Sequence, residues 1–111
     1  MSFFLSEEEL TELLDNIGEL GRLEAEAKTD YESSERELKL IEAEATKTLM
    51  ADGSSATAAK AMVGTHEGYA KGVRELRQKQ KRATIYRAKL EHQKMVFEAF
   101  RTYSANIRTS T

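Results

Sequence analysis

Basic side chains that can bind a polyanion are concentrated between residues 71 and 94. Lys and Arg recur there at helical spacing, so they form a stripe able to neutralise several phosphates of a nucleic acid. Tyr86 lies among them. An exposed tyrosine ring can stack on a base, although Tyr86 also fits the apolar stripe of the same segment. The predicted nucleic-acid-binding residues are Lys71, Arg74, Arg77, Lys79, Lys81, Arg82, Arg87, Lys89 and Lys94.

Residues that could carry out catalysis or bind a metal are not grouped in this way. His66 and His92 are far apart, and the acidic neighbours Glu67 and Glu91 cannot share a helix face with them. The glutamates of the first half lack an E-x-x-H partner, which favours a solvated face over acid–base carboxylates or a di-metal site. We therefore predict a non-enzymatic protein with no metal, no cofactor and no small-molecule substrate.

Charge divides the chain into two unlike halves. Residues 1–55 hold five Lys/Arg against fifteen Asp/Glu, a balance of −10, whereas residues 56–111 hold twelve against four, a balance of +8. One interpretation pairs an acidic helix with an antiparallel basic helix across the flanks of their seam. The other interpretation is that the basic half binds a polyanion. The sequence leaves both open.

Heptad repeats predict an all-α fold in which two long antiparallel helices form a hairpin. A capping box of Ser6 and Glu9 begins the first helix. At the turn, Gly53 can adopt the left-handed conformation, and Ser54 or Ser55 can cap the next helix. The expected elements are a helix over about 6–51, a turn at 52–55, a helix over about 56–103 and a flexible tail at 104–111, all in a single domain.

Apolar residues at the seam of this hairpin are expected to form a coiled coil. After Ala83 the apolar stripe of the second helix moves by one position, which predicts a local departure from ideal supercoiling. Further apolar residues beside the seam would remain exposed in one copy, so we predict self-association into a helical bundle or ring. The predicted core and oligomer residues are Leu10, Leu13, Ile17, Leu20, Tyr31, Leu38, Ile41, Leu76, Leu90, Phe97 and Phe100.

Three glycines, Gly64, Gly68 and Gly72, recur every four residues and so share one side of the predicted second helix. This spacing favours close helix packing or a hinge over ligand binding.

If the chain folds back at Gly53, each residue of the first helix lies opposite the residue of the second helix for which the two numbers sum to about 107. This pairing predicts an aromatic cluster at the open end of the hairpin. Its members are Phe3, Phe4, Leu5, Leu10, Phe97, Phe100 and Tyr103.

The layout of the chain resembles a known family. A long acidic helix and a Gly/Ser turn are followed by Ala-Lys-Ala-Met-Val at 59–63. The basic second helix ends in Phe-Glu-Ala-Phe-Arg-Thr-Tyr-Ser-Ala-Asn-Ile-Arg at 97–108. Over about residues 25–108 this pattern is similar to small phage proteins of the UvsY-like recombination-mediator type. The resemblance implies ring-forming helical protomers that bind single-stranded DNA and help to load a RecA-like recombinase in place of a single-strand-binding protein.

Two functions follow as alternatives. The first is an oligomeric phage-type accessory protein that binds single-stranded DNA through the basic face of the second helix and assists a RecA-like recombinase. The second is a protein-interaction module, such as a phage inhibitor of host defence or an assembly adaptor, without nucleic-acid binding. The absence of Cys, of a signal-peptide pattern and of a long apolar run predicts a cytoplasmic protein with no membrane partner. For a phage-encoded chain, that cytoplasm belongs to the infected bacterial host.

Overall fold

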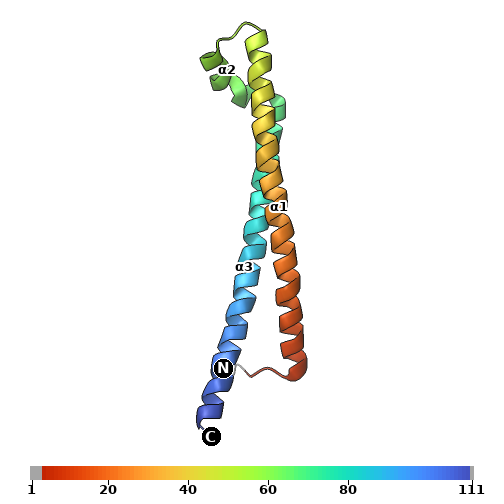
Figure 1. Cartoon of the computed structure of the whole chain (residues 1–111), viewed down its shortest axis with the longest axis vertical. Coiled ribbons are helices and arrows are strands. Elements are labelled where there is room, and N and C mark those ends of the chain that lie inside the picture. The colour runs from red at the N-terminus through yellow and green to blue at the C-terminus, as the bar shows by residue number, and fades with distance from the viewer. Residues whose placement is uncertain (1–3, 111) are drawn as a thin grey trace. The chain divides into compact units, whose positions relative to one another are not determined.

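The computed structural model describes residues 4–110, and within that range every element of regular structure is helical (Figure 1). This confirms the predicted all-α class. The elements are α1 (Glu7–Ala51), α2 (Ala56–Met62), the 3-10 helix η1 (Val63–Thr65) and α3 (Glu67–Ser110). The chain falls into two compact units, one made of Met1–Glu26 with Thr84–Thr111 and the other of Ala27–Ala83.

α1 begins at the capping box that the sequence predicts. The Ser6 amide donates to Glu9 Oε1 at 3.2 Å, and the Glu9 amide donates to Ser6 Oγ at 3.1 Å. These reciprocal hydrogen bonds satisfy two amides for which a helix start supplies no backbone partner. Glu7 and Glu8 add negative charge beside the positive end of the helix dipole. Local side chains therefore stabilise the first turn of α1.

The turn after α1 also follows its prediction. Gly53 has a φ of 102°, a conformation that glycine adopts without strain. The Gly53 amide donates to the Met50 carbonyl and the Ser54 amide donates to the Leu49 carbonyl, which are the two hydrogen bonds of a Schellman motif. Ser55 then caps α2 by accepting a hydrogen bond from an α2 amide at 3.2 Å.

The prediction of one continuous second helix over residues 56–103 is wrong. It is interrupted after Met62 by η1 and by His66, whose backbone is extended with φ −74° and ψ 125°. Residues 63–65 are two β-branched residues and a glycine, all weak helix formers. The Thr65 hydroxyl donates to the Met62 carbonyl at 2.7 Å, which stabilises the tighter 3-10 turn.

The end of the second helix differs from its prediction as well. α3 extends to Ser110, so the segment predicted as a flexible tail is helical as far as the structure describes it, and Thr111 lies outside the described residues. Neither Gly nor Pro follows Gly72 in the sequence, so no residue there breaks a helix. The Thr109 hydroxyl donates to the Ala105 carbonyl at 3.1 Å, inside the last turns.

The seam of α1 keeps its predicted seven-residue spacing over most of the helix. Both rows, which begin at Leu10 and Leu13, are buried or half-buried as far as Ala45. Beyond Ala45, the seven-residue spacing would place Thr48 in the seam, but Thr48 is exposed and the neighbouring Leu49 is half-buried. The packed position is thus filled by the apolar Leu49 instead of the polar Thr48.

The seam of α3 keeps the same spacing, so the predicted change of row after Ala83 is wrong. Gly72 and Lys79 occupy the packed row in the first part of α3. A search for apolar residues at seven-residue spacing misses both, because Gly72 has no side chain and Lys79 is charged. The buried and half-buried rows are Tyr69, Leu76, Ala83, Leu90, Phe97 and Ser104, and Gly72, Lys79, Tyr86, Gln93 and Phe100.

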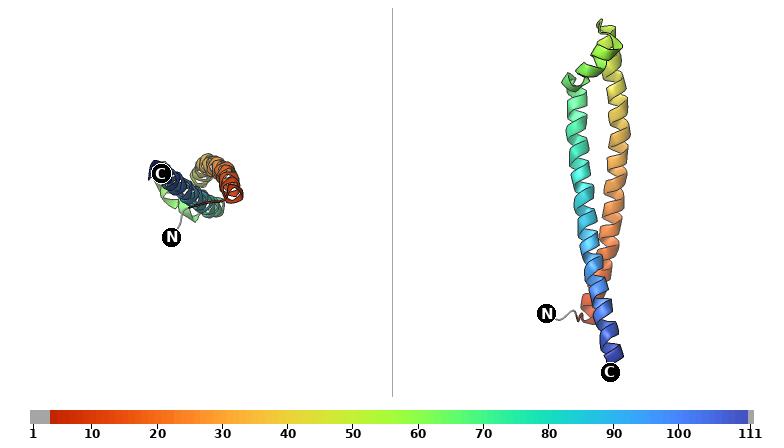
Figure 2. Two further views of the ribbon diagram at one scale, coloured as in Figure 1. Left: turned by 90° about the horizontal axis from the view of Figure 1, so that it is seen from below. Right: turned by 90° about the vertical axis from the view of Figure 1, so that its left-hand side faces the viewer.

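Within the unit Ala27–Ala83, the first part of α3 lies beside the second part of α1 (Figure 2). A Cβ atom at Gly72 would lie 2.8 Å from Leu38 Cδ1, so the absence of a side chain allows this close approach. The predicted pairing would instead place residue 72 opposite residue 35. The difference is about one helical turn. It follows from α2 and η1, which lengthen the connection between the long helices.

Large side chains are only partly buried. Within residues 4–110 none is fully buried, and Leu13 and Val63, at 7% and 4% exposure, come nearest. The other strongly buried apolar residues are alanines. The predicted core residues are all buried or half-buried, but Phe4 of the expected aromatic cluster is 67% exposed and Phe3 lies outside the described residues. A single copy therefore has a thin core.

Candidate nucleic-acid interface

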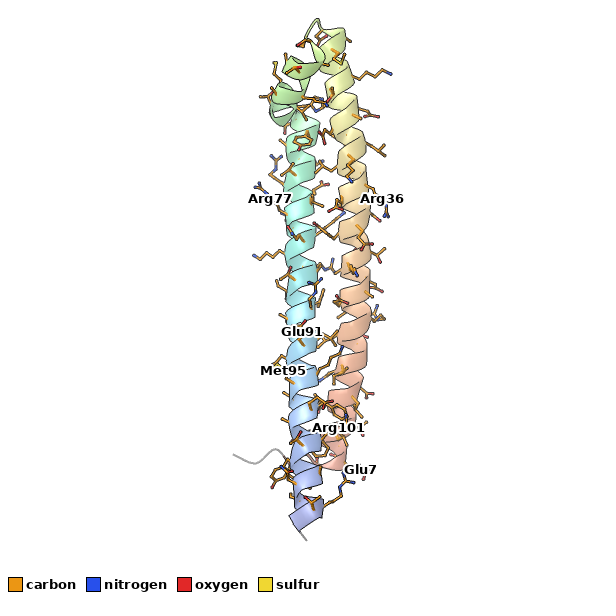
Figure 3. All side chains as sticks on the ribbon, turned by 60° about the vertical axis from the view of Figure 1, so that its left-hand side comes forward. Glu7, Arg36, Arg77, Glu91, Met95 and Arg101 are labelled. Carbon is orange, nitrogen blue, oxygen red and sulfur yellow. The ribbon has the colours of Figure 1, made fainter. Side chains whose placement is uncertain are left out.

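Four of the predicted nucleic-acid-binding residues lie on one outward side of α3, in the unit Ala27–Ala83. With the Tyr69 and Gly72 rows as heptad positions a and d, these four occupy positions b, c and f, the positions farthest from the seam. All four are exposed, and Figure 3 shows Arg77 on the side of α3 that faces away from α1. We call this set the outer basic face: Lys71, Arg74, Arg77 and Lys81.

The outer basic face is largely free of internal partners. In the part of the chain that the structure describes, no ion pair or hydrogen bond engages the side chains of Lys71, Arg77 or Lys81. The Arg74 guanidinium lies 3.8 Å from a carboxylate oxygen of Glu67, and the two side chains are 62% and 93% exposed. Such exposed pairs are worth little. The face therefore presents four cations over about 15 Å of helix, given a rise of about 1.5 Å per residue.

Lys79 does not belong to this face, because it lies in the seam. Its Nζ donates to Ser34 Oγ at 2.7 Å, and Ser34 is only 8% exposed. Tyr31, one turn earlier on α1, donates its hydroxyl to Glu35, which raises the pKa of the phenol. These side chains form a polar layer between helices whose other seam residues are mostly apolar. A polar seam residue lowers stability but specifies register.

Replacing the polar layer should stabilise the protein. For Lys79→Leu combined with Ser34→Ala, we expect the free energy of unfolding to rise by about 1 kcal/mol, because a half-buried polar pair is replaced by apolar side chains at a packed position. Urea unfolding followed by circular dichroism at one fixed protein concentration measures the change. Arg77→Leu, on the exposed side of the same helix, is the control and should change it by less than about 0.5 kcal/mol. A lower unfolding midpoint for the double variant would contradict the assignment.

The remaining four predicted residues lie beside the seam rather than opposite it. Arg82, Arg87, Lys89 and Lys94 are exposed at heptad positions e and g. Arg82 belongs to the unit Ala27–Ala83, whereas the other three belong to the unit that contains residues 84–111. The structure thus does not bring all nine cations onto one face. Helical spacing alone could not separate them, because the register of the seam decides which positions face outward.

The alternative interpretation of the charge asymmetry is that acidic and basic side chains pair across the helix flanks, and Arg87 makes such a pair. Arg87 Nε lies 3.8 Å from Glu24 Oε1, and the Glu24 side chain is 22% exposed, so this pair joins α1 to α3. Four further ion pairs among the described residues join positions on one helix, namely Arg22 with Glu19 and Glu26, Arg74 with Glu67, and Arg101 with Glu98. Pairing across the seam does not engage the outer basic face.

The other candidate residues from the sequence, Tyr86 and His66 among them, do not form a common site in the structure. Tyr86 is half-buried in a seam row, so only part of its surface is open for stacking. His66, expected within a continuous helical stripe, caps α3 instead, where its Nδ1 accepts from the Tyr69 amide at 3.4 Å. Among residues 4–110 no group of His, Asp and Glu side chains could hold a metal ion, and no helix there is long and apolar enough to cross a membrane.

Comparison with protein families, curated proteins and solved structures finds no match to this chain.

Proposed function

We propose that the chain is a non-enzymatic helical protein that self-associates and binds single-stranded DNA. In this proposal α1 and α3 form a continuous antiparallel coiled-coil hairpin, and several hairpins pack into a bundle or ring. The resemblance to UvsY-like mediators extends the proposal to a phage-type protein that assists a RecA-like recombinase in the cytoplasm of an infected bacterium. Each part has its own support and can fail separately.

The outer basic face is the observation that supports DNA binding. Its four cations recur every three to four residues on the exposed side of α3, and three of them have no partner among the described residues. Flexible single strands can bring successive phosphates to such a row, and each contact releases counterions. The half-burial of Tyr86 in a seam row favours contacts with the DNA backbone over base stacking, and therefore little sequence preference.

Exposed apolar side chains support self-association. Leu40 and Met95 are 68% and 70% exposed, while no large side chain among residues 4–110 is fully buried. Helices that leave so much apolar surface in water gain stability when further helices cover it. A bundle or ring of hairpins would bury these residues without any new fold.

Binding of a fluorescently labelled oligonucleotide, followed by anisotropy, tests the DNA-binding proposal directly. We expect binding at about 50 mM salt that weakens steeply as salt rises. If all four cations contact phosphates, the slope of log K against log salt is about −3 for each protomer, because each contact on a single strand contributes about −0.7. No binding at about 50 mM salt would end this proposal.

A protein-interaction module is the second candidate, and the same exposed apolar residues favour it. Leu40 and Met95 could contact another protein as readily as a further copy of the chain. An inhibitor of host defence or an assembly adaptor would need no nucleic-acid contact. Self-association or partner binding without any response to oligonucleotide would favour this candidate over the first.

A further inference from the structure

We propose that copies of the chain join through an acidic stripe at the start of α1, which docks into a lysine-lined groove between α1 and α2 of a second copy. This inference rests on the self-association proposed above and adds a charged contact between copies to the burial of their exposed apolar residues. Both surfaces lie outside the seam, and they belong to different units of the chain.

The groove lies within the unit Ala27–Ala83 and has a volume of about 480 Å³. Three lysines, Lys39, Lys47 and Lys60, line it, together with the apolar residues Ala43 and Met50. Met50 is 45% exposed, so an apolar side chain of this groove remains open to solvent. We call this surface the lysine groove. Its lining residues are Lys39, Glu42, Ala43, Thr46, Lys47, Met50 and Lys60.

The acidic stripe lies within the other unit, on the first turns of α1. Its members are separated by one, three or four residues, so they share one side of the helix. All are exposed, and Leu14 is 45% exposed. Among the described residues no cation pairs with Glu7, Glu8 or Asp15. The acidic stripe consists of Glu7, Glu8, Thr11, Leu14 and Asp15.

The two surfaces are complementary in charge, length and apolar content. Three carboxylates of the acidic stripe face three ammonium groups of the lysine groove, where Glu42 is the one like charge and leaves the groove at +2. The stripe spans about 12 Å and the α1 side of the groove about 16 Å, at 1.5 Å per residue. Leu14 supplies the apolar side chain that can cover Met50.

The charge of the two units favours the same contact. The unit that contains the acidic stripe holds six Lys/Arg and ten Asp/Glu, a balance of −4, and the unit that contains the lysine groove holds eleven and nine, a balance of +2. Unlike potentials speed encounter and disfavour contacts between like units. Each copy carries one acidic stripe and one lysine groove, so every copy can both offer and receive a contact.

Charge reversal of either surface tests this inference by sedimentation velocity. The groove variant carries Lys39→Glu, Lys47→Glu and Lys60→Glu, and the stripe variant carries Glu7→Lys, Glu8→Lys and Asp15→Lys. We expect each to raise the dissociation constant for self-association by about 100-fold, because like charges then meet across the contact. An equimolar mixture of the two variants should associate with 1:1 stoichiometry, because stripe and groove then carry opposite charges in both contacts between unlike variants.

The control variant carries Lys71→Glu, Arg77→Glu and Lys81→Glu, which makes the same charge change on the outer basic face. It should associate like the unmodified chain and lose DNA binding. Milder neutral variants, Lys39→Gln, Lys47→Gln and Lys60→Gln, should weaken association in the same direction, which separates a lost contact from a misfolded chain.

Three results would overturn the inference. A groove variant that associates as tightly as the unmodified chain would refute the contact while leaving self-association intact. A groove variant that loses oligonucleotide binding but keeps its association would assign the lysine groove to nucleic acid instead. An unmodified chain that sediments as a monomer would refute self-association itself, whatever the outcome of the DNA titration.

Discussion

Replacing Lys71, Arg74, Arg77 and Lys81 with glutamine should weaken binding of single-stranded DNA by at least about 100-fold at about 50 mM salt. These side chains are exposed on one side of α3 and project away from the seam, so the substitutions remove charge without disturbing packing. The slope of log K against log salt should fall by about 3 for each protomer, since about 0.7 is lost with each phosphate contact. Anisotropy titrations at several salt concentrations measure both quantities.

A control with the same change in net charge separates a local interface from general attraction. Lys89, Lys94, Arg101 and Arg108 lie on the same helix but in the other unit, and their replacement by glutamine also removes four charges. We expect this control to weaken binding by less than about tenfold, through long-range electrostatics alone. Equal losses from the two variants would show that net charge, and not the outer basic face, determines binding.

The helical class and most of the α1 seam could be predicted because they depend on local patterns. Seven-residue spacing fixes which side of α1 packs, and the capping box and the Schellman turn are short motifs with their own hydrogen bonds. The break at 63–66 was harder to predict, because two β-branched residues and one glycine only lower helix propensity without forbidding a helix.

The candidate interface could be predicted only in part, because outward and inward positions on α3 depend on its register. Gly72 and Lys79 break the apolar pattern in the row that packs, so the sequence suggests the wrong row for the first part of the helix. If the packed row is taken one residue later, Lys79 falls outside that row and is interpreted as an exposed cation. The register follows from the close approach of Leu38 to Gly72 and from the hydrogen bond of Lys79 to Ser34, and both involve residues far apart in the sequence.

Leu13→Ala should destabilise the protein by about 2 to 3 kcal/mol, whereas Leu14→Ala should cost less than about 1 kcal/mol. The two leucines are neighbours, but Leu13 is 7% exposed in the seam and Leu14 is 45% exposed on the acidic stripe. Truncating the buried side chain loses its transfer free energy and leaves a cavity that a thin core cannot fill. Urea unfolding at fixed protein concentration should show a clearly lower midpoint for Leu13→Ala alone.

The dependence on protein concentration separates the roles of the two leucines. Self-association stabilises the folded state by mass action, so a residue at the contact between copies matters more as protein concentration rises. The cost of Leu14→Ala should therefore grow between about 1 and 100 µM protein, while the cost of Leu13→Ala should change little. If Leu14→Ala lowers the free energy of unfolding equally at both protein concentrations, Leu14 does not lie in the contact between copies. If Leu14→Ala lowers it more than Leu13→Ala does, the register of the seam is wrong.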